Sequence, residues 1–174
     1  ENGAIYSVHE GFDGKLLYGT ANGLLKSFDR TSKIISTESA ADEDSFGENV
    51  SVRSIVEFKS KTYLGIFGRG LSLFENQEIG LPAQPEKLSQ ILTLSPQGND
   101  ILWIGTANNG VYTYDGETVA QDTRFDPLKN IAVWSIATSA NGTVWFATET
   151  GLFYFHGGEL NKILDGVDVR SVKV

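Results

Sequence analysis

The sequence predicts an all-β fold made of repeated four-stranded antiparallel sheets. One motif, an apolar strand with Ser or Thr at its third position, begins at residues 5, 52, 91 and 133, and a further copy begins at residue 169. The copies lie about 40 residues apart, which is the length of one β-propeller blade. The 19 glycines and the lack of a helical apolar period argue against helical repeats of similar length. We therefore expect about four propeller blades.

The first two strands of each blade can be located from their pattern. The first strand carries the motif and ends at a turn such as Asn141-Gly142, a strong hairpin signal. The second strand is a nearly continuous apolar run, which predicts burial on both faces between neighbouring blades. A small residue in this run would leave room where two sheets approach closely. These small residues are Gly19, Gly65, Gly105 and Ala147.

The outer two strands have a weaker pattern. The third strand follows another glycine and ends in an aromatic residue, at Phe28, Phe74, Tyr114 and Phe155. Phe28 comes one position late relative to its glycine, so the register of the first copy is open. The fourth strand is expected near residues 33–37, 78–81, 118–121 and 159–163. Its weak pattern is typical of a strand with a solvent-facing edge.

The repeats divide residues 1–174, a single propeller segment, into blades. The predicted limits are 1–48, 49–88, 89–130 and 131–167, and residues 168–174 would form the first strand of a further blade. A closed ring of four blades would leave that last strand unpaired or replacing the first one. We therefore favour an open arc of a larger propeller.

Charge and composition exclude several classes of partner. The chain has 14 basic and 22 acidic residues, a net charge of -8, and no basic run. This argues against nucleic acid or an anionic membrane surface as a partner. No apolar stretch approaches the length of a membrane span, so we expect no direct membrane insertion of this segment. Cysteine is absent, which excludes disulfides and thiolate metal sites. Methionine is absent too, and we expect the chain to be cut from a longer polypeptide, or processed.

The repeats resemble the two-component regulator propeller repeat. Its signature is a Val-x-Ser-Ile strand, then Leu-Trp-Ile-Gly-Thr, then Gly-Leu and an aromatic residue. Residues 101–114 match it best, and residues 144–155 match it with Ala147 in place of glycine. The second copy departs most, with Ile66 where threonine is usual and an additional Gly68-Arg69 in its turn. The resemblance covers nearly the whole chain.

The resemblance implies a role in sensing. Such repeats build the periplasmic, extracytoplasmic sensor region of hybrid two-component histidine kinases in Bacteroidetes. Those propellers are typically seven-bladed, and the receptors commonly respond to breakdown products of complex carbohydrates. The chain would then be about half of one propeller. It would be a non-enzymatic segment that binds an oligosaccharide, or a protein partner, at the propeller rim and relays the signal to a kinase outside it.

Ligand contacts are expected where the repeats differ. The second position of the first strand holds Tyr6, Arg53, Leu92, Trp134 and Arg170, a mixture without a common packing role. The turn between the second and third strands shares this rim. Arg, Asn and Glu can bond sugar hydroxyls, and Trp or Tyr can stack on a sugar ring. The predicted ligand-binding residues are Tyr6, Asn22, Arg53, Arg69, Asn108, Asn109, Trp134 and Glu149. The alternative for the asparagines is that turns favour them conformationally.

No pattern predicts a catalytic residue, a metal site or a cofactor. The two histidines, His9 and His156, occupy non-equivalent positions in different repeats, without metal-ligand spacing. The glycine-rich residues 65–70 lack the following helix that phosphate binding needs. The acidic segment 42–48 could offer oxygen ligands to calcium. Its spacing matches no known loop, and a solvated acidic loop is the simpler interpretation.

Two other functions stay open. A propeller enzyme, of the polysaccharide lyase or hydrolase type, would need His9 and His156 to meet at one channel mouth beside Glu149 or another carboxylate. A WD-like scaffold for protein interactions would show exposed rim patches without a concave pocket. An open arc also leaves two blade faces uncovered, so we expect self-association through them.

Overall fold

Four antiparallel four-stranded sheets make up the computed structural model, which describes residues 3–11, 13–39, 50–75, 78–80 and 86–174. The first sheet consists of β1 (Ile5–Glu10), β2 (Leu16–Thr20), β3 (Leu25–Phe28) and β4 (Ile35–Ser39). The second consists of β5 (Ser51–Phe58), β6 (Lys61–Phe67), β7 (Gly70–Glu75) and β8 (Glu78–Gly80). Each sheet is formed by strands consecutive in sequence.

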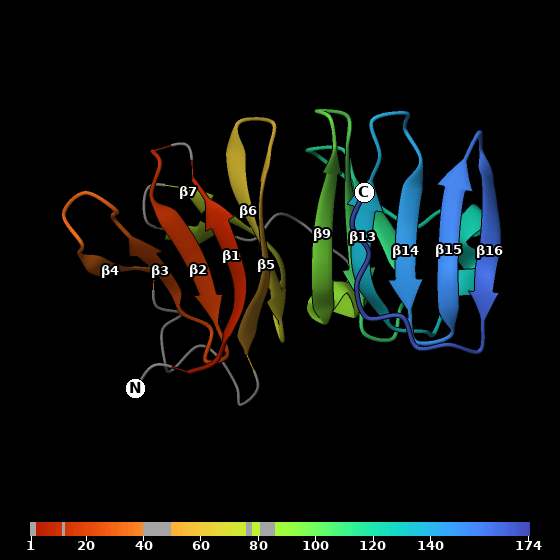
Figure 1. Ribbon diagram of the computed structural model, residues 1–174, viewed down its shortest axis with the longest axis horizontal. Helices are drawn as coiled ribbons and strands as arrows, with labels where there is room; N and C mark the ends of the chain where they lie inside the picture. The colour runs from red at the N-terminus through yellow and green to blue at the C-terminus, as the bar shows by residue number, and fades with distance from the viewer. Residues whose placement is uncertain (1–2, 12, 40–49, 76–77, 81–85) are drawn as a thin grey trace.

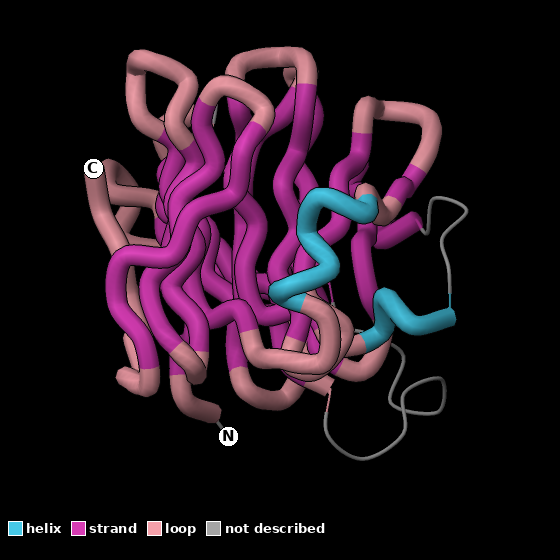
Figure 2. Tube along the Cα trace, turned by 90° about the vertical axis from the view of Figure 1, so that its right-hand side faces the viewer, coloured by secondary structure: helices cyan, strands magenta, loops and turns pink. Residues whose placement is uncertain are grey.

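The other two sheets follow the same plan. The third consists of β9 (Ile91–Gln97), β10 (Ile101–Thr106), β11 (Val111–Tyr114) and β12 (Val119–Ala120). The fourth consists of β13 (Val133–Thr138), β14 (Val144–Thr148), β15 (Gly151–His156) and β16 (Glu159–Asp165). Two 3₁₀ helices, η1 (Glu86–Ser89) and η2 (Thr123–Leu128), lie on the outside of the strands (Figure 2). None of the described residues forms a helix long and apolar enough to cross a membrane. The predicted all-β fold of four-stranded blades is confirmed.

The sheets are arranged side by side as an open arc (Figure 1). Their first strands β1, β5, β9 and β13 are successive neighbours at the centre, and the remaining strands extend outward. The first and last sheets lie at opposite ends of the longest axis. Each first strand therefore contacts the first strand of the next blade, which brings equivalent motif positions together.

Glycine in the second strand lets successive blades approach closely. A Cβ atom added to Gly19 would lie 2.5 Å from the Val52 side chain, and one added to Gly65 would lie 2.7 Å from that of Ile91. Val52 and Ile91 begin the motif in the next blade. A larger residue at either glycine would push two sheets apart. The close approach expected from the sequence is confirmed.

Apolar clusters fill the spaces between blades. Leu17, Leu25, Val52, Ile55, Leu64 and Ile66 pack between the first and second blades. Tyr63 belongs to the cluster between the second and third blades, and Trp103 to the one between the third and fourth. Burying one large apolar side chain contributes about 1.5–3 kcal/mol, so these clusters hold neighbouring blades together. Trp145, at the equivalent position of the last blade, is only half-buried.

The aromatic residue that ends the third strand has one register throughout. Phe28 pairs with Leu16, Phe74 with Thr62, and Tyr114 with Leu102. Their partners occupy the same position of the second strand. The register of the first copy, open from the sequence, is thus the same as in the next two.

Residues 167–174 lie beside β13 and contain no strand. Their backbone nevertheless makes the contacts of a first strand. Ser54 Oγ accepts a hydrogen bond from the Leu94 amide at 3.1 Å, and Ser135 Oγ accepts one from the Val172 amide at 3.3 Å. Leu94 and Val172 both end a copy of the motif. This equivalence supports a further blade at residues 168–174, which stays a prediction together with the blade limits.

Candidate functional site

Two of the predicted rim residues, Tyr6 and Arg53, meet in one pocket. Arg53 Cζ lies 3.8 Å from the centroid of the Tyr6 ring. Tyr6 is on β1 and Arg53 is on β5, so the pocket straddles two blades. Its volume is about 260 Å³, and it is lined by Tyr6, Ala21, Ser51, Arg53 and Phe67. The adjacency of successive first strands explains why these two positions meet.

The Arg53 guanidinium is held in a fixed orientation. Its Nε donates a hydrogen bond to Ser51 Oγ at 2.8 Å, and the Phe67 ring lies 5.6 Å from its Cζ. A guanidinium over an aromatic face gains about 0.5–1 kcal/mol at an exposed site. Among the described residues no acceptor bonds the two Nη groups. They are available to fork onto a ligand hydroxyl or carboxylate.

An equivalent stack surrounds Trp134. Arg170 Cζ lies 4.0 Å from the Trp134 ring. Asp168 accepts a hydrogen bond from Trp134 Nε1 at 2.9 Å through one oxygen, and one from Arg170 Nε at 2.8 Å through the other. As with Tyr6 and Arg53, the aromatic residue comes from one first strand and the arginine from the next copy of the motif.

Sequence reasoning did not identify the residues that hold the two arginines. Ser51 and Asp168 each lie two positions before an arginine, in Ser51-Val-Arg53 and Asp168-Val-Arg170. Side chains two residues apart in an extended chain point to the same side, so they can bond each other. The signal that could have identified them is the Val-Arg-Ser sequence shared by residues 52–54 and 169–171, because Ser51 and Asp168 directly precede it.

The predicted turn residues are engaged in hydrogen bonds with other groups of the protein. Asn22 Oδ1 accepts a hydrogen bond from Thr20 Oγ1 at 2.6 Å. Asn109 Nδ2 donates to the Lys87 carbonyl oxygen and to Asn108 Oδ1, both at 3.0 Å. Glu149 Oε1 accepts the Ala132 amide at 2.9 Å. None of these residues lines the Tyr6–Arg53 pocket. Their contacts fit a conformational role, and ligand binding by them stays a prediction.

Arg69 lies in the turn between β6 and β7 and is half-buried. Burial lowers the pKa of its guanidinium from the ordinary value, yet an arginine remains protonated at neutral pH. It does not line the pocket beside Arg53. The structure therefore brings together Tyr6 and Arg53, and places Trp134 with Arg170, while Arg69 lies outside both groups.

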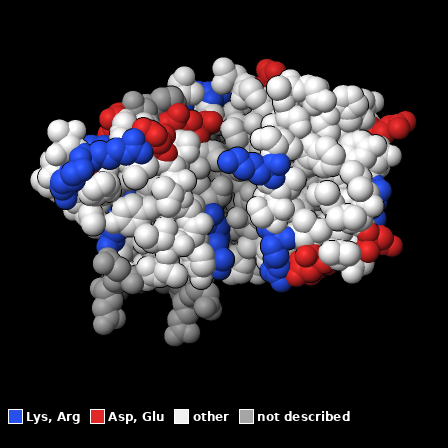
Figure 3. All heavy atoms as spheres, viewed as in Figure 1, with Lys and Arg blue, Asp and Glu red and all other residues white. Residues whose placement is uncertain are grey.

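The charge at the centre of the arc differs from that of the chain. The net charge is -8, but Lys and Arg atoms lie on both sides of the central hollow in its lower half, with Asp or Glu atoms beside those on the right (Figure 3). Tyr6, Arg53 and Trp134 lie on first strands that border the centre, and Arg170 lies in the segment beside β13. An acceptor-rich ligand would meet hydrogen-bond donors there.

The two histidines do not meet. His9 Nε2 lies 3.6 Å from Glu57 Oε1, between β1 and β5. His156, on β15, has its Nδ1 atom 2.9 Å from Thr143 Oγ1. Within the described ranges no three His, Asp or Glu side chains cluster as a metal site. The acidic segment 42–48 lies outside the described residues.

Comparisons with known proteins give structural likeness only. No protein-family model matches the sequence, and no curated protein is similar to it at a significant level. Among solved structures, one similar chain is the extracellular domain of a protein provisionally assigned to a hybrid two-component system of B. thetaiotaomicron. It is 23% identical with a TM-score of 0.73, over 94% of this chain and 22% of that one. A second structure of that domain gives 22% identity and a TM-score of 0.76.

Two further propellers are similar at lower identity. Virginiamycin B lyase from Staphylococcus aureus is 13% identical with a TM-score of 0.71, over 92% of this chain and 55% of that one. The WD40 β-propeller domain of Doa1 is 12% identical with a TM-score of 0.66, over 91% and 53%. The chain thus spans 22% of the first neighbour's length. The structure is a β-propeller segment, and its predicted likeness to the extracellular domains of hybrid two-component systems is confirmed at the level of fold.

Proposed function

We propose that this chain is a non-enzymatic, ligand-binding segment of the periplasmic sensor region of a hybrid two-component receptor. An oligosaccharide would bind at the rim beside Arg53 and Tyr6, and the signal would pass to a kinase outside this chain. The observation that carries the proposal is the Arg53 guanidinium, stacked on Tyr6 with its Nη groups directed to no described acceptor.

The pocket suits one unit of a longer sugar chain. Small-molecule sites usually measure about 300–1,000 Å³, and this pocket is about 260 Å³. Arg53 would fork hydrogen bonds to hydroxyl oxygens, and the Phe67 ring would contact an apolar sugar face. The remaining units would extend along the central hollow, where Trp134 offers a second aromatic surface.

A site built from two blades suits a relay. Tyr6 belongs to the first blade and Arg53 to the second, so a ligand that bonds both favours one packing of these blades over others. A ligand shifts an equilibrium only by its difference in affinity for the two states. The contacts between β1 and β5 would be the place where that difference arises.

The alternative functions have weaker support. The likeness to virginiamycin B lyase, at 13% identity, concerns the fold. His9 and His156 lie in different blades, and Glu149 bonds a backbone amide. These three residues therefore do not form the joint site that the enzyme alternative requires. A protein scaffold of the WD type is less favoured because the rim carries a concave pocket.

We also propose that the chain self-associates through the uncovered faces of its first and last blades. Ile5 and Val8 on the first blade are exposed, as are Ile163 and Leu164 on the last. In the interior of the arc, Ile91 and Leu94 of β9, which are equivalent to Ile5 and Val8, are buried against the neighbouring blade.

Calorimetric titration of the complete sensor region with a panel of oligosaccharides tests the function. Arg53→Gln should weaken binding of the recognised glycan at least tenfold, because it removes charge-assisted hydrogen bonds worth about 1.5–3 kcal/mol each. Arg30→Gln is the matched control, since Arg30 pairs with Glu10 on the surface and lines no described pocket. Absence of any glycan binding or kinase response would exclude the carbohydrate proposal.

A further inference from the structure

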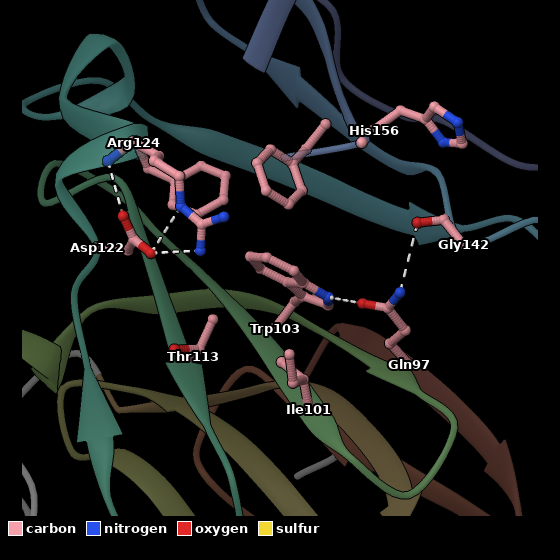
Figure 4. Close-up of a pocket in the computed structure, with 11 residues that line it drawn as sticks. Gln97, Ile101, Trp103, Thr113, Asp122, Arg124, Gly142 and His156 are labelled. Atoms are coloured by element: carbon pink, nitrogen blue, oxygen red, sulfur yellow. Dashed lines mark hydrogen bonds and ion pairs between the residues drawn. The ribbon is translucent and has the colours of Figure 1, made fainter. Parts of the chain in front are cut away.

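A second cavity lies between the third and fourth blades, apart from the Tyr6–Arg53 pocket (Figure 4). Its volume is about 350 Å³. Ile101 and Trp103 of β10 and Phe155 of β15 form its apolar walls, and Arg124 of η2 and Gln97 of β9 flank it. None of the residues predicted from the sequence as ligand contacts lines it.

Arg124 is held in place on one side of this cavity. Asp122 caps η2, accepting the Arg124 amide at 2.8 Å through Oδ1. Its Oδ2 accepts hydrogen bonds from Arg124 Nε at 2.8 Å and Nη2 at 2.5 Å. Arg124 Cζ also lies 5.0 Å from the centroid of the Phe155 ring. The remaining edge of the guanidinium, Nη1, points away from Asp122 toward the middle of the cavity (Figure 4).

Gln97 is fixed on the opposite side. Its Oε1 accepts a hydrogen bond from Trp103 Nε1 at 2.9 Å, and its Nε2 donates to the Gly142 carbonyl oxygen at 3.4 Å. The bond to Gly142 bridges the third and fourth blades, whereas the bond from Trp103 lies within the third blade (Figure 4). The Trp103 donor is already used, whereas a side-chain amide nitrogen has a second hydrogen to donate.

The groups left over are therefore donors. Asp122 Oδ2 and Gln97 Oε1 already accept bonds, while Arg124 Nη1 faces the cavity without a described acceptor and Gln97 Nε2 has a second hydrogen to donate. Donors that converge between apolar walls match a ligand with an anionic acceptor and an apolar body. A volume near the lower end of the usual range for small-molecule sites sets its size at about one six-membered ring.

We propose that this cavity binds a small organic carboxylate carried on a six-membered ring. The carboxylate accepts hydrogen bonds from Arg124, and the ring packs between Ile101 and Phe155. The Asp122–Arg124 pair is neutral as a unit, so the attraction is local and the affinity is modest, with a Kd of about 1 mM. The inference does not depend on the function proposed for the rim pocket.

Three ligands that share a six-membered ring test separately whether binding requires the carboxylate and whether it requires an apolar ring. Glucuronate carries the carboxylate on a sugar, cyclohexanecarboxylate carries it on an apolar ring, and glucose lacks it. In ¹H–¹⁵N NMR titrations of the 174-residue chain, we expect at least one of the two acids to shift the Trp103 indole N–H signal and the Gln97 side-chain signals. Glucose should leave both unchanged. Which acid binds more tightly tells whether the natural ligand is a sugar acid or an apolar acid.

Arg124→Gln should weaken binding of the acids at least tenfold, because the charged Nη1 donor is lost. Arg30→Gln, which removes another surface arginine paired with a carboxylate, should leave it unchanged. Unaltered backbone signals of β1–β8 in Arg124→Gln would show that the fold is retained. Three results would overturn the proposal: equal shifts with glucose, acid binding that survives Arg124→Gln, or no response of the Trp103 signal to either acid. If the Trp103 signal does not respond, Asp122 and Arg124 serve only to cap η2.

Discussion

Strands β1 and β9 carry the same motif but bury it very differently. Ile5 and Val8 of β1 are 57% and 62% exposed, whereas their equivalents in β9, Ile91 and Leu94, are 0% and 5% exposed. The residue types are nearly the same. The difference comes from the neighbour, because Gly65 of the preceding blade packs against both Ile91 and Leu94, and no described blade precedes β1.

The comparison shows what the motif encodes. The apolar side chains of the motif pack against a neighbouring sheet, and they are buried only where that sheet is present. Trp103 and Trp145 show the same difference in burial on the second strand. Trp103 is buried against Phe125 of η2 and Phe146 of the next blade, whereas Trp145 contacts Tyr154 of its own sheet and stays half-buried. Each blade thus supplies only one of the two surfaces that form an interface, and the neighbouring blade supplies the other.

The largest effect on stability is expected when the equivalent isoleucines of β9 and β1 are each replaced by alanine. Ile91→Ala should lower the free energy of unfolding by about 2–5 kcal/mol, because it opens a cavity between the second and third blades. Ile5→Ala should change it by less than about 0.5 kcal/mol, because the side chain is already exposed. Urea denaturation of the two variants and the unchanged chain measures both values.

These two variants are each other's control, since the atoms removed are the same. A similar loss of stability in both would mean that β1 is covered in solution. A small loss in Ile91→Ala would mean that the second and third blades do not pack as described.

The fold was predictable because the same pattern recurs and every copy supports the others. Gly19, Gly65 and the aromatic residues of the third strands could be placed before any contact was known, because each has one role in every blade. The contact between Tyr6 and Arg53 follows from the same architecture, since successive first strands are neighbours. The pairing of an aromatic residue with an arginine was not foreseen, because it requires side-chain geometry across two blades.

The parts of the site that do not repeat could not be predicted. Asp122 and Arg124 lie in the connection between β12 and β13, and their bond arises from the start of η2. The corresponding connection before β9 holds η1, but its sequence contains neither Asp nor Arg. Asn109 and Glu149 were predicted as ligand contacts because of their position in a turn. Their side chains bond Lys87 and Ala132, which are distant in sequence and became neighbours only through the fold.

An intermediate effect is expected on self-association. If the exposed face of β1 serves as one half of an interface, Val8→Glu should weaken association of the chain at least tenfold, because a charge would be buried against an apolar surface. Thr37→Glu, on the exposed outer strand β4, is a control for added charge. Sedimentation velocity over a range of concentrations measures the change.

Two results would contradict this expectation. A strictly monomeric chain at high concentration would show that the open faces do not associate. Equal association of Val8→Glu and the unchanged chain would place the interface elsewhere on the molecule.

The smallest effect concerns Tyr63, which lies in the covered interface of β6. Burial, followed by its hydrogen bond with Tyr114, raises the pKa of the Tyr63 hydroxyl above its ordinary value of 10.0. The folded state therefore keeps this proton at pH values where the unfolded chain loses it, and stability falls as the pH rises above about 10. Tyr63→Phe removes this contribution, so its free energy of unfolding should decline less steeply above pH 10 than that of the unchanged chain. Denaturant titrations at pH 8, 10 and 11 give the two slopes, with Tyr154→Phe in the last blade as the control (Tyr154 is half-buried). Parallel slopes for Tyr63→Phe and the unchanged chain would show that water reaches this interface, and that β6 is covered no better than the open face of β1.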